Sequence, residues 1–95
     1  MTTKHTPGPW VVTRTKRATT VTEVDGSEIA SVFMLGIVEQ GRANAALIAA
    51  APELLAVLLD ARELVDYLAN VGNEAAEECF RRIEAVVAKA NGETR

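Results

Sequence analysis

The chain has 95 residues, of which 48% are hydrophobic and only 4% aromatic, so we expect one globular domain over 1–95 with an aliphatic, alanine-rich core. The net charge of −3 argues against duplex nucleic acid as a partner, because proteins that bind duplexes are usually basic. No apolar run reaches the roughly 20 residues of a membrane-spanning helix, and Pro7 and Pro9 interrupt the place where a signal peptide needs an apolar helix. A cytoplasmic protein with no membrane partner is therefore expected.

The first nine residues (1–9) are expected to form an irregular lead-in. Pro7 and Pro9 each favour extended geometry at the preceding residue, and Gly8 between them permits a turn. The single tryptophan, Trp10, follows directly. Its indole either packs at the end of a sheet against a helix, or serves as an aromatic platform that stacks a base or anchors a partner.

Three segments rich in β-forming residues predict an antiparallel β-meander over 10–38. They are 10–15, 18–24 and 28–34. The dipeptide Asp25-Gly26 between the second and third segments is a strong hairpin signal.

The end of this meander is unusually apolar. Every position of Val32–Val38 is apolar except Gly36, whereas a strand with one face in water should alternate. The segment is therefore either covered on both faces or part of a subunit interface, and Gly36 marks a bulge or a bend.

A helical part is predicted over 42–91, beginning near Gly41. The alanine-rich stretch 43–51 has high helix propensity and runs into Pro52. Proline is tolerated in the first turn of a helix but not in its interior. Pro52 therefore either begins a new helix or kinks a continuous one.

A break is predicted before the last helix. Gly72 suits a left-handed helix cap, and Asn73 suits the N-cap of the helix that follows. That helix has one apolar face and ends before a frayed tail over 92–95. Cys79 lies at a spacing that places it on this face, so we expect it to be a small core residue. Because it is the only cysteine, an internal disulfide is excluded.

The predicted fold is α+β: a three-stranded antiparallel β-meander followed by two to three α-helices that form an αα-hairpin. The helix after Pro52 is apolar over far more than one face. One small sheet and one further helix cannot cover so much apolar surface, so we expect a homo-oligomer, either a dimer or a multiple of dimers. The alternative is that the helices 43–51, 52–70 and 73–91 fold back and cover one another.

Two short stretches carry a resemblance to a known group. They are His-Thr-Pro-Gly-Pro-Trp over 5–10 and Asn-Ala-Ala-Leu-Ile-Ala-Ala-Ala-Pro-Glu-Leu-Leu over 44–55. With these motifs the chain resembles a widespread group of small accessory proteins encoded by tailed phages and prophages. The resemblance covers about a quarter of the chain, and most members of the group have no assigned function.

Five residues are candidate ligand contacts: His5, Trp10, Arg14, Arg42 and Asn44. Arg42 and Asn44 are expected at a helix N-terminus, where free backbone N–H groups favour an anion. Arginine adds a bidentate fork for phosphate, and Asn44 serves either as a contact to a base or ribose or as a helix cap. The irregular lead-in would place His5 over the ligand pocket that the other candidate residues form.

Nothing in the sequence predicts catalysis. It holds one histidine, whereas zinc sites need three or four protein ligands, and it has none of the common nucleophile or phosphate-loop motifs. We therefore expect no enzyme activity, no metal and no cofactor.

The resemblance, taken with the five candidate residues, implies a phage-encoded anti-defence protein in the cytoplasm of the infected host. It would bind and sequester a nucleotide-derived immune signal, a small anionic ligand, at subunit junctions. The alternative is a phage protein that inhibits a host defence or replication protein by direct contact, through the apolar helix face or the strand end at Val32–Val38. A nuclease or phosphodiesterase that uses His5 is the weakest hypothesis.

Overall fold

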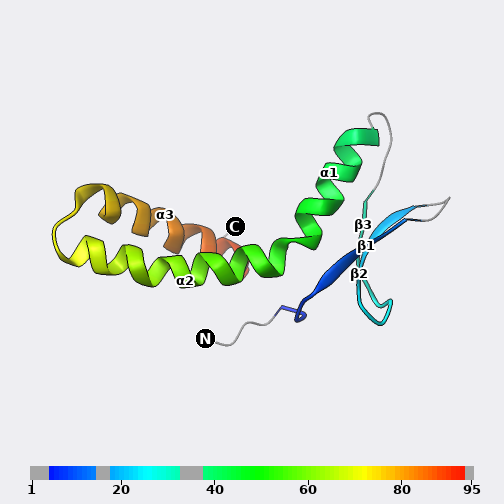
Figure 1. Cartoon of the computed structure of the whole chain (residues 1–95), viewed down its shortest axis with the longest axis horizontal. Helices are drawn as coiled ribbons and strands as arrows, with labels where there is room; N and C mark the ends of the chain where they lie inside the picture. The colour runs from blue at the N-terminus through cyan, green and yellow to red at the C-terminus, as the bar shows by residue number, and fades with distance from the viewer. Residues whose placement is uncertain (1–4, 15–17, 33–37, 94–95) are drawn as a thin grey trace. The chain divides into compact units, whose positions relative to one another are not determined.

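The computed structural model describes residues 5–14, 18–32 and 38–93. It has a three-stranded sheet followed by three helices (Figure 1), which confirms the predicted α+β fold. The strands are β1 (Trp10–Arg14), β2 (Thr19–Glu23) and β3 (Glu28–Val32), and the helices are α1 (Val38–Ala49), α2 (Ala51–Asn70) and α3 (Glu74–Ala90).

The described chain divides into two compact units. One is Pro7–Leu54, and the other contains the described residues before Pro7 and after Leu54. The first unit therefore holds the sheet and α1, and the second holds most of α2 with α3. The expectation of one domain over 1–95 stays a prediction.

The sheet is an antiparallel meander in the order β1-β2-β3. The turn between β2 and β3 is the one that Asp25-Gly26 predicts. Gly26 has a positive φ of 94°, which costs a glycine little, and its N–H donates to the Glu23 carbonyl. The Ser27 N–H donates to Asp25 Oδ1 at 2.8 Å, so the aspartate side chain holds the turn from within.

The core of the first unit lies between the sheet and α1. Val12, Val21 and Ala30 are paired across the three strands, and α1 contacts each strand. Val21 and Ala45 are fully buried. Gly41, one turn before Ala45, is also buried. Because these two helix positions carry little or no side chain, α1 packs closely on the strands.

The helical part begins earlier than the sequence predicts. β3 ends at Val32 and α1 already begins at Val38, not near Gly41. Glycine has a low intrinsic helix propensity, but Gly41 is buried within α1, so the packing of the helix outweighs that propensity. The predictions for the apolar run Val32–Val38 fall largely on 33–37, which lie outside the described residues.

Pro52 begins a new helix. α1 ends at Ala49, and Pro52 is the second residue of α2. The first turn of a helix leaves its N–H groups without intrahelical acceptors, so the missing N–H of proline costs nothing there.

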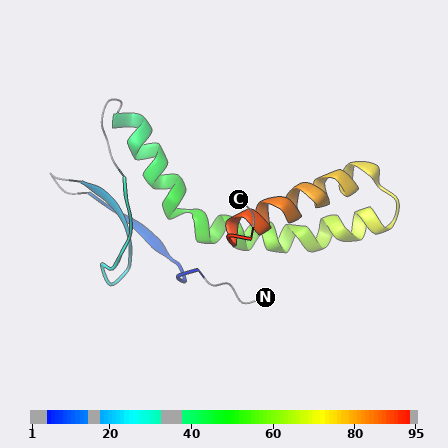
Figure 2. The same cartoon turned by 180° about the vertical axis from the view of Figure 1, so that it is seen from behind.

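The second unit is an antiparallel helical hairpin. Figures 1 and 2 both show α3 running back alongside α2. The turn has the predicted chemistry: Gly72 has a φ of 92°, and the N–H groups of Gly72 and Asn73 donate to Ala69 and Leu68, which is a Schellman cap. The Asn73 side chain then accepts the Ala76 N–H at 3.0 Å as the N-cap of α3.

Candidate functional site

The five predicted contact residues are divided between the two compact units. His5 belongs to the unit with the helical hairpin, whereas Trp10, Arg14, Arg42 and Asn44 belong to the unit with the sheet. The two groups of residues are therefore described separately.

His5 holds the lead-in to the hairpin. Its Nε2 lies 2.7 Å from the carbonyl oxygen of Ala90, the last residue of α3. A carbonyl only accepts, so Nε2 carries the proton and donates. The other ring nitrogen, Nδ1, is buried and has no partner among the described residues. This hydrogen bond satisfies one of the carbonyls left open at a helix C-terminus.

Trp10 and Arg14 stand at the two ends of β1. Trp10 is half-buried, and its indole Nε1 is buried with no hydrogen-bond acceptor in the part of the chain that the structure describes. Arg14 is exposed. Because strand residues alternate between faces, positions 10 and 14 project from the same face. They are about 13 Å apart at the rise of a strand.

Arg42 and Asn44 do not lie at the N-terminus of α1, where they were expected. They are the fifth and seventh residues of α1 and both are exposed, so they lie beyond the free N–H groups of the first turn. Residues two apart on a helix are separated by about 200° around its axis and do not face each other. The helix start near Gly41 that this prediction assumed is therefore wrong, because α1 begins at Val38, whereas the role of the two residues as ligand contacts stays a prediction.

The two sequence motifs meet at Gly8 and Pro52. A Cβ atom at position 8 would lie 2.8 Å from Pro52 Cβ and 3.1 Å from Pro52 Cγ. Real side chains do not approach so closely, so glycine is the residue that fits there. The Gly8–Pro9 peptide is cis. The two motifs thus pack against each other within the first unit, and we call this contact the motif joint.

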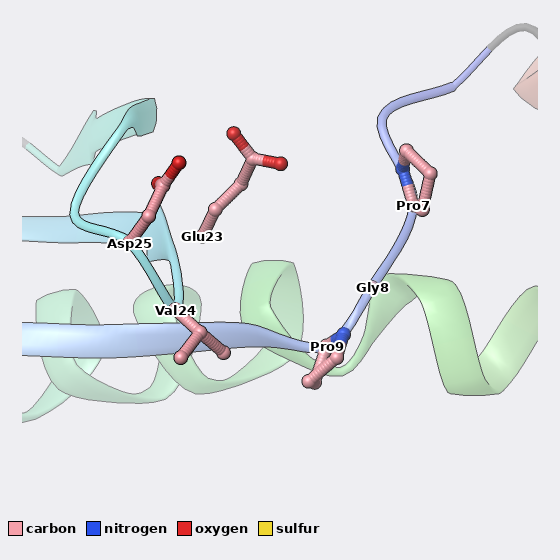
Figure 3. Close-up of a pocket in the computed structure, with 6 residues that line it drawn as sticks. All are labelled: Pro7, Gly8, Pro9, Glu23, Val24 and Asp25. Carbon is pink, nitrogen blue, oxygen red and sulfur yellow. The ribbon is translucent and has the colours of Figure 1, made fainter.

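Beside this joint lies an open recess of about 280 Å³. Figure 3 shows its lining, which the lead-in and the β2–β3 turn supply: Pro7, Gly8, Pro9, Glu23, Val24 and Asp25. Its charged groups are the carboxylates of Glu23 and Asp25, which project in the same direction (Figure 3). The hydrogen bond from the Ser27 backbone N–H lowers the pKa of Asp25 below its ordinary value, which keeps the carboxyl ionised. The recess therefore disfavours an anion.

The hairpin leaves a large apolar surface uncovered. α2 has no buried residue. The exposed fractions are 66% for Val57, 71% for Leu64, 44% for Leu68 and 63% for Val71. The excess of apolar surface predicted for this helix is confirmed, whereas the homo-oligomer inferred from it stays a prediction.

Cys79 corrects one expectation. It is exposed, whereas Ala76, Ile83 and Val87 of the same helix are buried. α2 covers α3 from one side only, and Cys79 lies at the edge of the apolar face, which α2 does not reach. Its spacing alone could not show how wide the covered face is.

Two further observations on the described segments concern metal ions and membranes. No group of three histidine, cysteine or carboxylate side chains there is placed to hold a metal ion. No single described helix is long and apolar enough to cross a membrane. The helices Glu39–Ala49 and Ala51–Asn70 reach the required length and apolar composition only when taken together, and the chain bends at the break between them.

Comparison with known families places this chain among the proteins of bacteriophages. Residues 1–94 match the family of Salmonella phage P22 protein Y8K6. Because the match spans nearly the whole chain, the chain belongs to that family. No curated protein and no solved structure matches significantly.

Neither the recess nor the arrangement of the exposed apolar face of α2 was predicted from the sequence. The recess depends on the lead-in lying against the β2–β3 turn, and no local pattern announces that. The exposed face does have a local signal, because apolar residues recur along α2 at alternating intervals of four and three. In the sequence, this row of apolar residues stands beside a second apolar row that faces α3, so the pattern alone did not separate the two rows.

Proposed function

We propose that this phage protein acts without catalysis, by direct protein–protein contact that inhibits a host protein, and that the contact surface is the exposed apolar face of α2. The observation that carries this proposal is the exposure of Val57, Leu64 and Leu68 on α2 and of Val71 directly after its end. Contiguous apolar patches on small proteins usually mark interaction surfaces.

The chemistry of the remaining side chains supports a non-catalytic role. Nε2 of the single histidine donates to a main-chain carbonyl, so it is not available as a base for a reaction. The recess near the motif joint presents carboxylates, which suit a basic side chain better than a phosphate. Arg42 and Asn44 diverge from each other on α1.

An infection assay tests the proposal. A phage that lacks this gene is complemented with the wild-type chain, with Leu64→Glu, or with Ala56→Glu as the matched control, since Ala56 is exposed on α2 away from the apolar face. We expect plaque formation to fall to the level of the empty vector for Leu64→Glu and to stay at the wild-type level for Ala56→Glu. Equal plaque formation by both variants, each shown to be folded by circular dichroism, would contradict it.

Nucleotide sequestration is the second candidate, and Trp10 is the observation that favours it. The buried indole N–H lacks an acceptor in the described structure, and Arg14 projects from the same face of β1. A ligand with a base and a phosphate would match such a pair. Calorimetry with cyclic dinucleotides and ADP-ribose tests it: binding that is lost in Trp10→Ala and Arg14→Ala supports sequestration, and the absence of heat with the wild-type chain rules out these ligands.

A further inference from the structure

The exposed face of α2 has the pattern of a coiled-coil seam. We call it the open row and define it as Val57, Ala61, Leu64 and Leu68 of α2 with Val71 of the turn that follows, whose positions differ by four, three, four and three. Apolar residues at these alternating intervals form a stripe that packs against another helix. All members except Ala61, which is half-buried, are exposed.

The open row is not the face that packs on α3. That face is identified by Arg62, whose guanidinium forms a 3.1 Å ion pair with Glu84 of α3. Leu58 and Val65 lie beside Arg62 by helical spacing and are half-buried. α2 therefore carries two apolar rows, one used within the hairpin and one unpartnered. Such a helix is typical of a bundle with more than two helices.

We propose that a second copy of this chain covers the open row, so that the two α2 helices pack antiparallel at the centre of a four-helix bundle. The proposal rests on the proposed function and deepens it, because it names the second copy as the partner that covers this face until the host protein takes its place. A two-fold axis makes one patch serve both copies, so the patch must be complementary to itself.

The order of small and large side chains supplies that complementarity. In an antiparallel pair centred between Ala61 and Leu64, Ala61 meets Leu64 of the second copy, and Val57 meets Leu68 of the second copy. Each smaller side chain is thus opposed by a larger one, which fills the space between the helices. A parallel pair would place Ala61 against Ala61 and leave a gap.

The polar side chains beside the open row agree with the same arrangement. Asp60 and Tyr67 precede Ala61 and Leu68 and lie along one border of the row. The antiparallel pairing brings Asp60 of each copy close to Tyr67 of the other, so a phenol O–H faces a carboxylate acceptor. No carboxylate is brought against a carboxylate along this border.

The surface area that two copies would bury is also large enough for a specific interface. Four side chains that are about half to two thirds exposed contribute on the order of 400 Å² per copy, and the flanking atoms raise the total buried by two copies to roughly 1,000 Å². That value is at the lower end for a specific interface, so we expect a dimer that forms at micromolar concentrations.

The first test is the oligomeric state of the full chain. Native mass spectrometry and sedimentation equilibrium should show a dimer for the wild-type chain and for Ala56→Glu. In Leu64→Glu and, independently, Val57→Glu, the dissociation constant should rise by roughly 100-fold, because each dimer would bury two carboxylates without partners. A wild-type chain that stays monomeric up to high micromolar concentrations overturns the proposal, as does a dimer that tolerates both substitutions.

The second test fixes the orientation. In a Cys79→Ser background, Val57→Cys and Leu68→Cys chains are treated with a short bis-maleimide, alone and mixed. The antiparallel pairing predicts strong cross-linking only in the mixture, because position 57 lies opposite position 68. Cross-links that form equally well within each single variant overturn the antiparallel arrangement.

The two proposals fail in different ways. If the wild-type chain is monomeric but Leu64→Glu still abolishes the effect on infection, the second copy is excluded and a host protein remains the partner of the open row. If the dimer is lost in Leu64→Glu while infection is unchanged, the second copy stands and the proposed function fails.

Discussion

Gly8 shows how the absence of a side chain allows two segments, the lead-in and the start of α2, to pack against each other. The residue is exposed, yet its missing side chain points at the ring of Pro52 in the first turn of α2. A proline ring is rigid and its Cβ is fixed to the helix backbone, so the clash of a larger residue is not relieved by rotation of a side chain.

We therefore predict that Gly8→Ala lowers the free energy of unfolding by about 1–3 kcal/mol, the usual cost of forcing an atom into an occupied space. Urea unfolding at constant m-value measures it. The control is the same change in a Pro52→Gly background, where the opposing Cβ atom is absent. There Gly8→Ala should cost less, and an equal cost in both backgrounds would contradict the assigned contact.

Asp25 gives a prediction about pH. The Ser27 backbone N–H bonds the carboxylate and lowers its pKa from the ordinary value of 3.8. A carboxyl whose pKa is lower in the folded chain stabilises the fold above the unfolded pKa, and this contribution is lost as the pH falls through the folded pKa. The carboxyl carbon of Asp25, followed by NMR, should titrate at lower pH in the native chain than in urea. Coincident midpoints would show that the turn hydrogen bond is absent in solution.

At the scale of elements, the sequence predicts best where the decisive chemistry is local. Asp25-Gly26 and Gly72-Asn73 each specify a turn through their own backbone preferences and side-chain acceptors, and both turns form as predicted. The start of α1 is different. It depends on the close packing of Gly41 and Ala45 against the strands, which outweighs local propensity.

The candidate site follows the same division. The sequence shows that both motifs are distinctive and contain proline, but it does not show that Gly8 contacts Pro52. The sequence does not show the positions of Arg42 and Asn44 on α1, which depend on where the helix begins and on which face it turns toward the strands. The predicted helix start near Gly41 was wrong, because α1 begins at Val38.

At the scale of the whole molecule, each unit buries only a small amount of apolar surface by itself. Among the described residues, the fully buried apolar side chains are Val21 and Ala45 in the sheet unit, and in the hairpin the buried ones are Ala76, Ile83 and Val87. Small cores of this kind give marginal stability. A second copy packed on the open row would bury additional apolar surface on α2, the helix of the hairpin that has no buried residue.

This reasoning leads to a prediction about heat stability. If two copies unfold together, the midpoint of thermal unfolding must rise with protein concentration, because dilution favours the separated, unfolded chains. For a chain of this size the rise is about 3–4 °C for each tenfold increase in concentration. Calorimetry over a hundredfold range should show this rise for the wild-type chain and for Ala56→Glu, whereas Leu64→Glu should melt lower and at a midpoint independent of concentration. A wild-type midpoint that does not change with concentration would mean that the hairpin is stable with its apolar face open.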